Sequence, residues 1–140
     1  MSLPRFHLAF PVVDLDATRR FYVEVLGARP ARSADRWLDL DLFGHQLSAH
    51  LVDQAPSTAG RNPVDGDAVP IPHFGIILPW ASWEALAQRI EEAGIAFRIA
   101  PRVRFAGQPG EQGTFFVDDP SGNALEFKAF REDAHVFRTQ

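Results

Sequence analysis

Apolar and polar positions alternate along the chain with two different periods, and each change of period marks a new element. The stretch Phe6 to Val12 is apolar and predicts a buried strand. A stripe with helical spacing follows, capped by Asp14 or Asp16 and ended by Gly27. Segments 28–33, 36–43 and 46–52 then have strand patterning, and Gly44-His45 is predicted as the tight turn between the last two.

The second half of the chain repeats this order. It is predicted to contain a strand at 72–78, a helix from a Ser82 cap to Gly94, and strands near 95–100, 103–105, 113–117 and 124–130. His7 precedes Gly27 by 20 residues and His73 precedes Gly94 by 21, so the two histidines occupy equivalent positions. In the same register, Ser48 is the counterpart of Glu126.

The two halves predict one domain with two modules, at about 5–53 and 72–130, and a C-terminal tail at 131–140. Between the modules, residues 54–71 form a predicted linker. The surrounding stretch 53–72 holds four prolines and two glycines without hydrophobic periodicity, which is typical of a linker or a functional lid.

Composition and charge then limit the partners and the metal ligands that the chain can have. The chain has 140 residues and a net charge of -4, so it lacks the basic surface that nucleic acids require. It has no cysteine, so a bound metal has to be held by histidines and carboxylates. No signal-peptide pattern and no apolar stretch long enough to span a bilayer is found, and we expect a cytoplasmic protein without a membrane or nucleic-acid partner.

Alternation places several polar side chains on the strand faces that are not apolar. His7 lies opposite Phe6 and Leu8, and Glu126 lies opposite Leu125 and Phe127. Gln46, Ser48 and His50 share one face of their strand. Glu126 also has a plainer interpretation, as a surface carboxylate paired with Lys128 or Arg131.

Two βαβββ halves with a histidine on each first strand and a glutamate on the last strand resemble the vicinal oxygen chelate superfamily. Its members include glyoxalase I, extradiol dioxygenases, and fosfomycin- and bleomycin-resistance proteins. The segment Phe115-Phe116-Val117-Asp118-Asp119-Pro120-Ser121-Gly122-Asn123-Ala124-Leu125-Glu126-Phe127 is similar to the closing hairpin of that family. The entry from His7 through Val13-Asp14-Leu15 and Phe21-Tyr22 to Gly27 is similar to its first strand and helix.

The resemblance implies an α+β fold in which the two modules form a curved mixed-sheet cup around a divalent metal. The implied ligands are His7, His73 and Glu126, a facial triad with open coordination positions. Fe(II) is favoured, with Mn(II), Zn(II) and Ni(II) as alternatives.

The choice of reaction depends on the position equivalent to Glu126. Glyoxalase I has a second glutamate there, whereas this chain offers Ser48, His50 or Gln46. A three-ligand site fits an Fe(II) extradiol-type dioxygenase, although Phe116 stands where ring-cleaving members carry a tyrosine. A glyoxalase-type isomerase, a Mn(II) thiol or water transferase that confers antibiotic resistance, and a drug-binding protein without catalysis are the alternatives.

Further residues have candidate roles around the predicted cup. His50 is a candidate second-sphere base or a structural hydrogen-bond partner. Arg102 and Arg104 either clamp an anionic substrate or are solvated surface residues. Phe116, Ser48 and Gln46 are candidates to contact the small-molecule substrate. Because one pair of modules commonly closes its cup against a second copy, we expect a homodimer.

Overall fold

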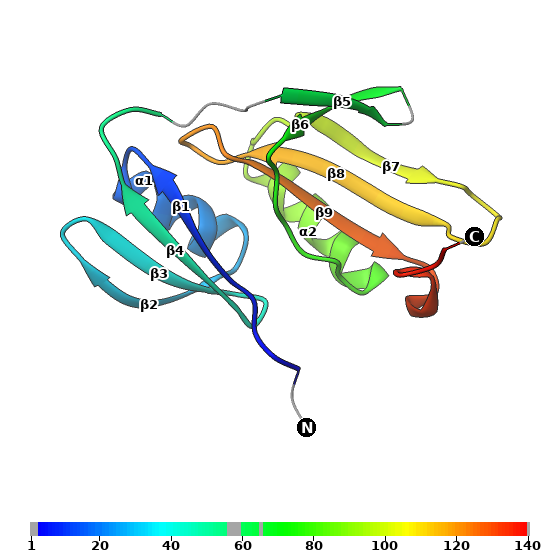
Figure 1. The fold of residues 1–140 in the computed structure, drawn as a ribbon, viewed down its shortest axis with the longest axis horizontal. Helices are drawn as coiled ribbons and strands as arrows, with labels where there is room; N and C mark the ends of the chain where they lie inside the picture. The colour runs from blue at the N-terminus through cyan, green and yellow to red at the C-terminus, as the bar shows by residue number, and fades with distance from the viewer. Residues whose placement is uncertain (1–2, 56–59, 65, 140) are drawn as a thin grey trace. The chain divides into compact units, whose positions relative to one another are not determined.

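The computed structural model describes residues 3–55, 60–64 and 66–139, and these form two compact units. Unit 1 contains 3–55 together with Asp119–Asn123, and unit 2 contains 60–64, 66–118 and 124–139. Each unit has a helix on one face of its main sheet (Figure 1). The fold class predicted from the sequence is confirmed: strands predominate, and they form curved mixed sheets of the βαβββ type.

Unit 1 has a four-stranded sheet in the order β1-β4-β3-β2, in which β1 and β4 are parallel and the other pairs are antiparallel. Of the two predicted caps, Asp14 is the one that caps the helix, by accepting a 2.9 Å hydrogen bond from the Ala17 amide. The helix continues as a π-helical segment that ends at Val25, and Gly27 follows with a φ of 83° that suits glycine. The elements are β1 (His7–Val12), α1 (Leu15–Arg19), the π-helix (Arg20–Val25), β2 (Arg29–Ala34), β3 (Trp37–Leu42) and β4 (His45–Leu51).

The turn between β3 and β4 lies one residue earlier than predicted. Phe43 and Gly44 both have positive φ, at 51° and 88°, as a two-residue hairpin turn requires. The Asp41 carboxylate accepts a 2.7 Å hydrogen bond from the Gly44 amide and steadies the turn. A non-glycine residue in this conformation is uncommon, and the sequence pattern therefore pointed to Gly44-His45 instead.

Unit 2 is built around the antiparallel sheet β7-β8-β9. The segment after β6 runs parallel to β9 through bridges at Phe74–Leu125 and Ile77–Lys128, so it takes the place that β1 has in unit 1. The elements are β5 (Gly60–Val64), β6 (Asp67–Ile71), α2 (Trp80–Glu92), β7 (Ile99–Arg104), β8 (Gln112–Asp118), β9 (Ala124–Phe130) and a 3₁₀ turn (Asp133–His135).

Three expectations for unit 2 need correction. The predicted linker contains a two-stranded ribbon, β5 paired with β6, whose prolines are tolerated because both strands are edges. The helix begins at Trp80 with Pro79 as its cap, rather than at Ser82. The two short strands predicted near 95–105 are one strand, β7, with a register shift between Ile99 and Arg102.

The core of unit 2 lies between α2 and one face of its sheet. Trp83 is buried and its indole N–H donates a 3.0 Å hydrogen bond to the Phe127 carbonyl. A Cβ at Gly113 would lie 2.6 Å from the Trp83 ring, so β8 needs glycine there for the helix to pack. Because Phe115 and Phe127 face this core, their alternating neighbours Phe116 and Glu126 face the other side, which we call the open face.

The described residues include no helix that is both long enough and apolar enough to cross a membrane.

Candidate metal centre

His73 and Glu126 are brought together by the parallel pairing at the edge of β9. The Phe74 amide donates to the Ala124 carbonyl at 3.2 Å, and the Glu126 amide donates to the Phe74 carbonyl at 2.9 Å. These bonds hold the residue before Phe74 next to the open face of β9. The His73 Nε2 atom accordingly lies 3.2 Å from Glu126 Oε1.

Each of the two side chains is held by a further hydrogen bond. His73 Nδ1 lies 2.7 Å from the Pro70 carbonyl oxygen, which can only accept, so Nδ1 is the donor and Nε2 is directed to Glu126. The Thr114 hydroxyl donates to Glu126 Oε2 at 2.5 Å. Metal-binding histidines commonly donate their second ring N–H to a backbone carbonyl, and metal-binding carboxylates are commonly hydrogen-bonded in the same way.

The pair is electrostatically coupled. The hydrogen bond with Glu126 raises the pKa of His73, while burial opposes this effect. Burial alone would raise the pKa of Glu126, but hydrogen bonds from His73 and Thr114, together with the charge of Lys128, lower it. Both shifts favour a Glu126 carboxylate paired with a protonated His73 ring. A bound metal ion would take the place of the proton between the two groups.

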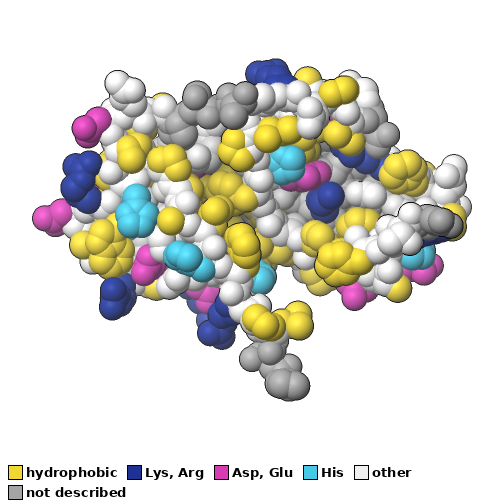
Figure 2. Space-filling model, viewed as in Figure 1, with side chains coloured by type: hydrophobic (Ala, Val, Ile, Leu, Met, Phe, Trp, Pro, Cys, Tyr) yellow, Lys and Arg dark blue, Asp and Glu magenta, His cyan; other side chains and the backbone are white. Residues whose placement is uncertain are grey.

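The open face around this pair is partly aromatic and partly charged. The Phe116 ring meets the His73 ring edge-on, with centroids 5.0 Å apart and an interplanar angle of 79°. Phe116 is the cross-strand partner of Glu126, and Thr114 is the partner of Lys128. Figure 2 shows a histidine, an acidic and a basic side chain gathered over the region where β8 and β9 lie.

Arg102 and Arg104 of β7 lie on the same sheet but are oriented by another carboxylate. Asp67 on β6 is 2.9 Å from Arg102 Nη1 and 3.8 Å from Arg104 Nη2. Arg104 is buried, whereas Arg102 is partly exposed. The structure thus places the two predicted arginines at the ribbon β5-β6, which the sequence pattern had not revealed.

The parallel strand pair of unit 1 has the same register as the parallel pairing in unit 2 but carries different side chains. His7 pairs with Gln46 and Ala9 pairs with Ser48 between β1 and β4. In unit 2 Phe74 pairs with Leu125, which puts His73 and Glu126 at the positions of His7 and Ser48. The sequence-based equivalence of Ser48 with Glu126 therefore agrees with the strand register.

Asp39 is a functional candidate that the sequence pattern missed. It lies opposite Ser48 on β3, and the Ser48 hydroxyl donates to its Oδ1 at 2.6 Å. Its signal was the alternation of Trp37, Asp39 and Asp41, which share one face of β3. A carboxylate is therefore present beside Ser48, although it comes from the neighbouring strand.

The remaining candidates of unit 1 are exposed. His50 lies opposite Pro11, on the face of β4 that it shares with Gln46 and Ser48, which we call the open face of unit 1. His7 and Gln46 line a surface pocket of about 410 Å³, together with His45, which accepts a 3.1 Å hydrogen bond from the Phe6 amide.

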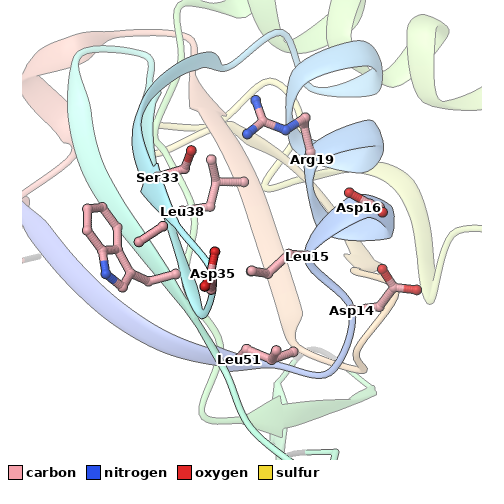
Figure 3. Close-up of a pocket in the computed structure, with 10 residues that line it drawn as sticks. Asp14, Leu15, Asp16, Arg19, Ser33, Asp35, Leu38 and Leu51 are labelled. Carbon is pink, nitrogen blue, oxygen red and sulfur yellow. The ribbon is translucent and has the colours of Figure 1, made fainter.

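A second pocket of unit 1 lies beside the start of α1. It measures about 340 Å³ and is shown in Figure 3, with Leu15 and Leu38 among carboxylates that include Asp14 and Asp35. The described residues lining it include none of the candidates named from the sequence.

Two donor atoms are placed as ligands of one divalent metal ion would be. An imidazole nitrogen and a carboxylate oxygen converge at His73 and Glu126, and these are the ligand types that Fe(II), Mn(II) and Zn(II) accept. Within residues 3–55, 60–64 and 66–139, no three metal-binding side chains form one cluster. His7 belongs to unit 1, and its role as third ligand stays a prediction.

Thr114 and Pro70 are the supporting residues that the sequence could not identify. A threonine in a strand and a proline in a presumed linker carry no chemical signal by themselves. Their roles arise because β8 pairs with β9 and because β6 runs directly into the segment that holds His73.

Comparisons with known proteins assign the chain to a broad class. A family model described as the Glyoxalase/Bleomycin resistance protein/Dioxygenase superfamily matches residues 6–127. None of the curated proteins matches the chain. A solved glyoxalase/bleomycin resistance protein/dioxygenase from Alicyclobacillus acidocaldarius is 36% identical, with 96% of each chain covered and a TM-score of 0.79.

Two more distant solved structures share the fold. The fosfomycin resistance protein FosX from Listeria monocytogenes is 19% identical, with 92% of this chain and 94% of that chain covered and a TM-score of 0.65. Lactoylglutathione lyase from Agrobacterium tumefaciens is 19% identical, with 90% and 92% covered and a TM-score of 0.64. At this identity the likeness concerns the fold alone.

Proposed function

Because the chain belongs to the glyoxalase/bleomycin resistance protein/dioxygenase superfamily, we propose that it is a divalent-metal-dependent enzyme acting on small molecules. The proposed ligands are His7, His73 and Glu126. One observation carries the proposal: His73 Nε2 and Glu126 Oε1 are 3.2 Å apart, and each side chain is anchored by its other polar atom. That arrangement is what a metal ligand pair requires, since both donors are oriented before the metal binds.

When bound, a divalent metal would act as a Lewis acid that polarises substrate oxygens at its open coordination positions. The chain's own residues supply the rest. The Pro70 carbonyl keeps the His73 proton on Nδ1, and Thr114 fixes the rotation of the Glu126 carboxylate. The Phe116 ring beside His73 excludes water from one side of the pair.

For the reaction itself we propose an Fe(II)-dependent, extradiol-type dioxygenation of a substrate with two adjacent oxygen atoms. Two imidazoles and one carboxylate form the facial triad that suits Fe(II) and leaves positions for substrate and O₂. His50 is the proposed acid-base residue, because Phe116 replaces the tyrosine of ring-cleaving members.

An isomerase or a Mn(II) transferase is the second candidate, and Asp39 favours it. A glyoxalase-type proton transfer needs a carboxylate base near the metal, and the Ser48–Asp39 hydrogen bond supplies a carboxylate at the position equivalent to Glu126. A drug-binding protein without a metal is the third alternative.

Metal analysis of the purified chain tests the proposal, followed by oxygen uptake with small diphenols after anaerobic loading with Fe(II). Bound iron with diphenol-dependent oxygen uptake supports the dioxygenase. Retention of manganese, zinc or nickel without oxygen uptake supports the second candidate. A chain that binds none of these metals at micromolar concentration contradicts metal dependence and favours the drug-binding protein.

We propose a cytoplasmic homodimer as the working assembly. His7 lies in unit 1 and the His73–Glu126 pair lies in unit 2, so His7 can be supplied by the same chain or by a second copy. Mixing a His7→Ala chain with a Glu126→Ala chain separates these arrangements, because only exchange between copies restores one complete site.

A further inference from the structure

The open face of the sheet β7-β8-β9 carries several cations beside Glu126. Arg102, Thr114 and Lys128 are consecutive partners across the three strands, so their side chains share one face. Glu126 precedes Lys128 by two residues on β9, and Arg104 follows Arg102 by two on β7. Three cationic side chains therefore share the face that holds the proposed metal ligand.

Lys128 differs from the two arginines in its surroundings. Both arginines have Asp67 within ion-pair distance. Lys128 is half-buried, and no carboxylate of the described residues forms an ion pair with it. It is also the one lysine in a chain that otherwise uses arginine for its positive charges.

The described charged residues on this face are mostly cations. Asp67 and Glu126 are two carboxylates against three cations, and Asp118 at the end of β8 is already bound by both Nε and Nη2 of Arg98 at 2.8 Å. A divalent metal on Glu126 would add two more positive charges. Lys128 acts on Glu126 through its charge but forms no direct ion pair among the described residues, so an anionic ligand is the group that would complete this face.

We propose that Lys128 is a substrate-binding residue of this site, and that the substrate carries an anionic oxygen group, a carboxylate or a phosphonate, beside the oxygens that reach the metal. This inference rests on the proposed function, because it takes Glu126 as a metal ligand. Lys128 selects the substrate by charge. Its compact ammonium on a flexible side chain can bind either a planar carboxylate or a tetrahedral phosphonate.

A purely structural role for Lys128 makes a different prediction. If the ammonium only balances the Glu126 carboxylate, its removal would change protein stability and metal affinity and would affect neutral and anionic ligands equally. A substrate-binding role affects the anionic ligand alone.

The test is calorimetric titration of the Mn(II)-loaded protein with catechol and with 3,4-dihydroxybenzoate, which share adjacent hydroxyls and differ by one carboxylate. The unaltered protein is expected to bind the benzoate about tenfold more tightly or better, as one charge-assisted hydrogen bond allows. Lys128→Met should remove most of this preference and leave catechol affinity unchanged, whereas Lys128→Arg should keep it. The control Arg36→Met removes an exposed cation of unit 1, paired with Asp53 at 3.7 Å, and should keep it too.

Equal weakening of both ligands by Lys128→Met, or no change in either, overturns the inference. Titration of the metal-free protein with inorganic phosphate, followed by ³¹P NMR, separates this failure from that of the proposed function. If Mn(II) does not bind, the proposed function fails, and weaker phosphate binding by Lys128→Met still supports the anion site. If Mn(II) binds but neither anion depends on Lys128, the proposed function stands and the Lys128 inference is wrong.

Discussion

The two parallel strand pairs of the molecule share a register but differ in backbone and in chemistry. In unit 1, β1 and β4 pair continuously over six residues, and Ala9 fits opposite Ser48. In unit 2 the segment before α2 pairs with β9 through two bridges, and Gly75 lies so close that a Cβ there would be 1.5 Å from the Glu126 carbonyl oxygen. The repeat thus provides one scaffold twice, and in its second copy the backbones approach so closely beside Glu126 that the facing position has to be glycine.

The largest expected effect comes from adding a methyl group at Gly75, where the two backbones of unit 2 approach each other closely. In Gly75→Ala, the new methyl group would overlap the backbone of β9 and force the two strands apart, with a loss of about 3 kcal/mol or more in the free energy of unfolding. Urea unfolding measures the change. The matched variant in unit 1, Ala9→Gly, should cost only about 0.5 to 1 kcal/mol. Equal losses in the two variants would contradict the contrast between the strand pairs.

Metal retention should depend on the histidine of unit 2. We expect His73→Ala to abolish retention of the metal through purification while the protein stays folded, because the proposed site loses the imidazole ligand beside Glu126. Metal content and circular dichroism of the purified variant check this result. His50→Ala, which changes a histidine on the open face of unit 1, should retain the metal. Full metal occupancy in His73→Ala would show that the proposed ligand set is wrong.

The hydroxyl groups of Thr114 in unit 2 and Ser48 in unit 1 should differ in their effect on metal affinity. Thr114→Val keeps the side-chain shape but removes the hydrogen bond that orients Glu126, so we expect metal affinity to fall about 10- to 100-fold. Ser48→Ala breaks the corresponding bond to Asp39 in unit 1 and should change metal affinity by less than about threefold, since Asp39 is not a proposed ligand. Competition with a fluorescent metal chelator measures both values, and a larger loss in Ser48→Ala would reverse the assignment.

The smallest effect concerns a contact within unit 1 between two segments that are far apart in the sequence. The buried Tyr22 hydroxyl donates a 2.9 Å hydrogen bond to Asp119 Oδ2, which also accepts from the Asn123 side chain at 2.9 Å. Tyr22→Phe should therefore cost about 1 to 1.5 kcal/mol, because the carboxylate keeps its second donor. Thermal unfolding checks this loss, and a variant as stable as the parent would mean that the bond is energetically neutral.

Alternation predicted the strand that contains Glu126 and the face on which it lies, because both are local properties. The strand containing Glu126 was predicted at 124–130 and is β9 (Ala124–Phe130). The orientation of Glu126 away from Leu125 and Phe127 followed from the two-residue period. The ribbon β5-β6 was missed, since five-residue strands containing proline have the local pattern of a loop.

The sequence by itself determined the two βαβββ modules, the equivalence of His7 with His73, and the face on which Glu126 lies, because hydrophobic period and spacing fix these features within each element. Only the tertiary structure decided that Thr114 and Pro70 anchor the pair, that Asp39 joins Ser48, and that Lys128 forms no direct ion pair with a carboxylate among the described residues. These contacts join side chains across strands, and their partners depend on register and on close backbone approach, which short-range patterns do not encode.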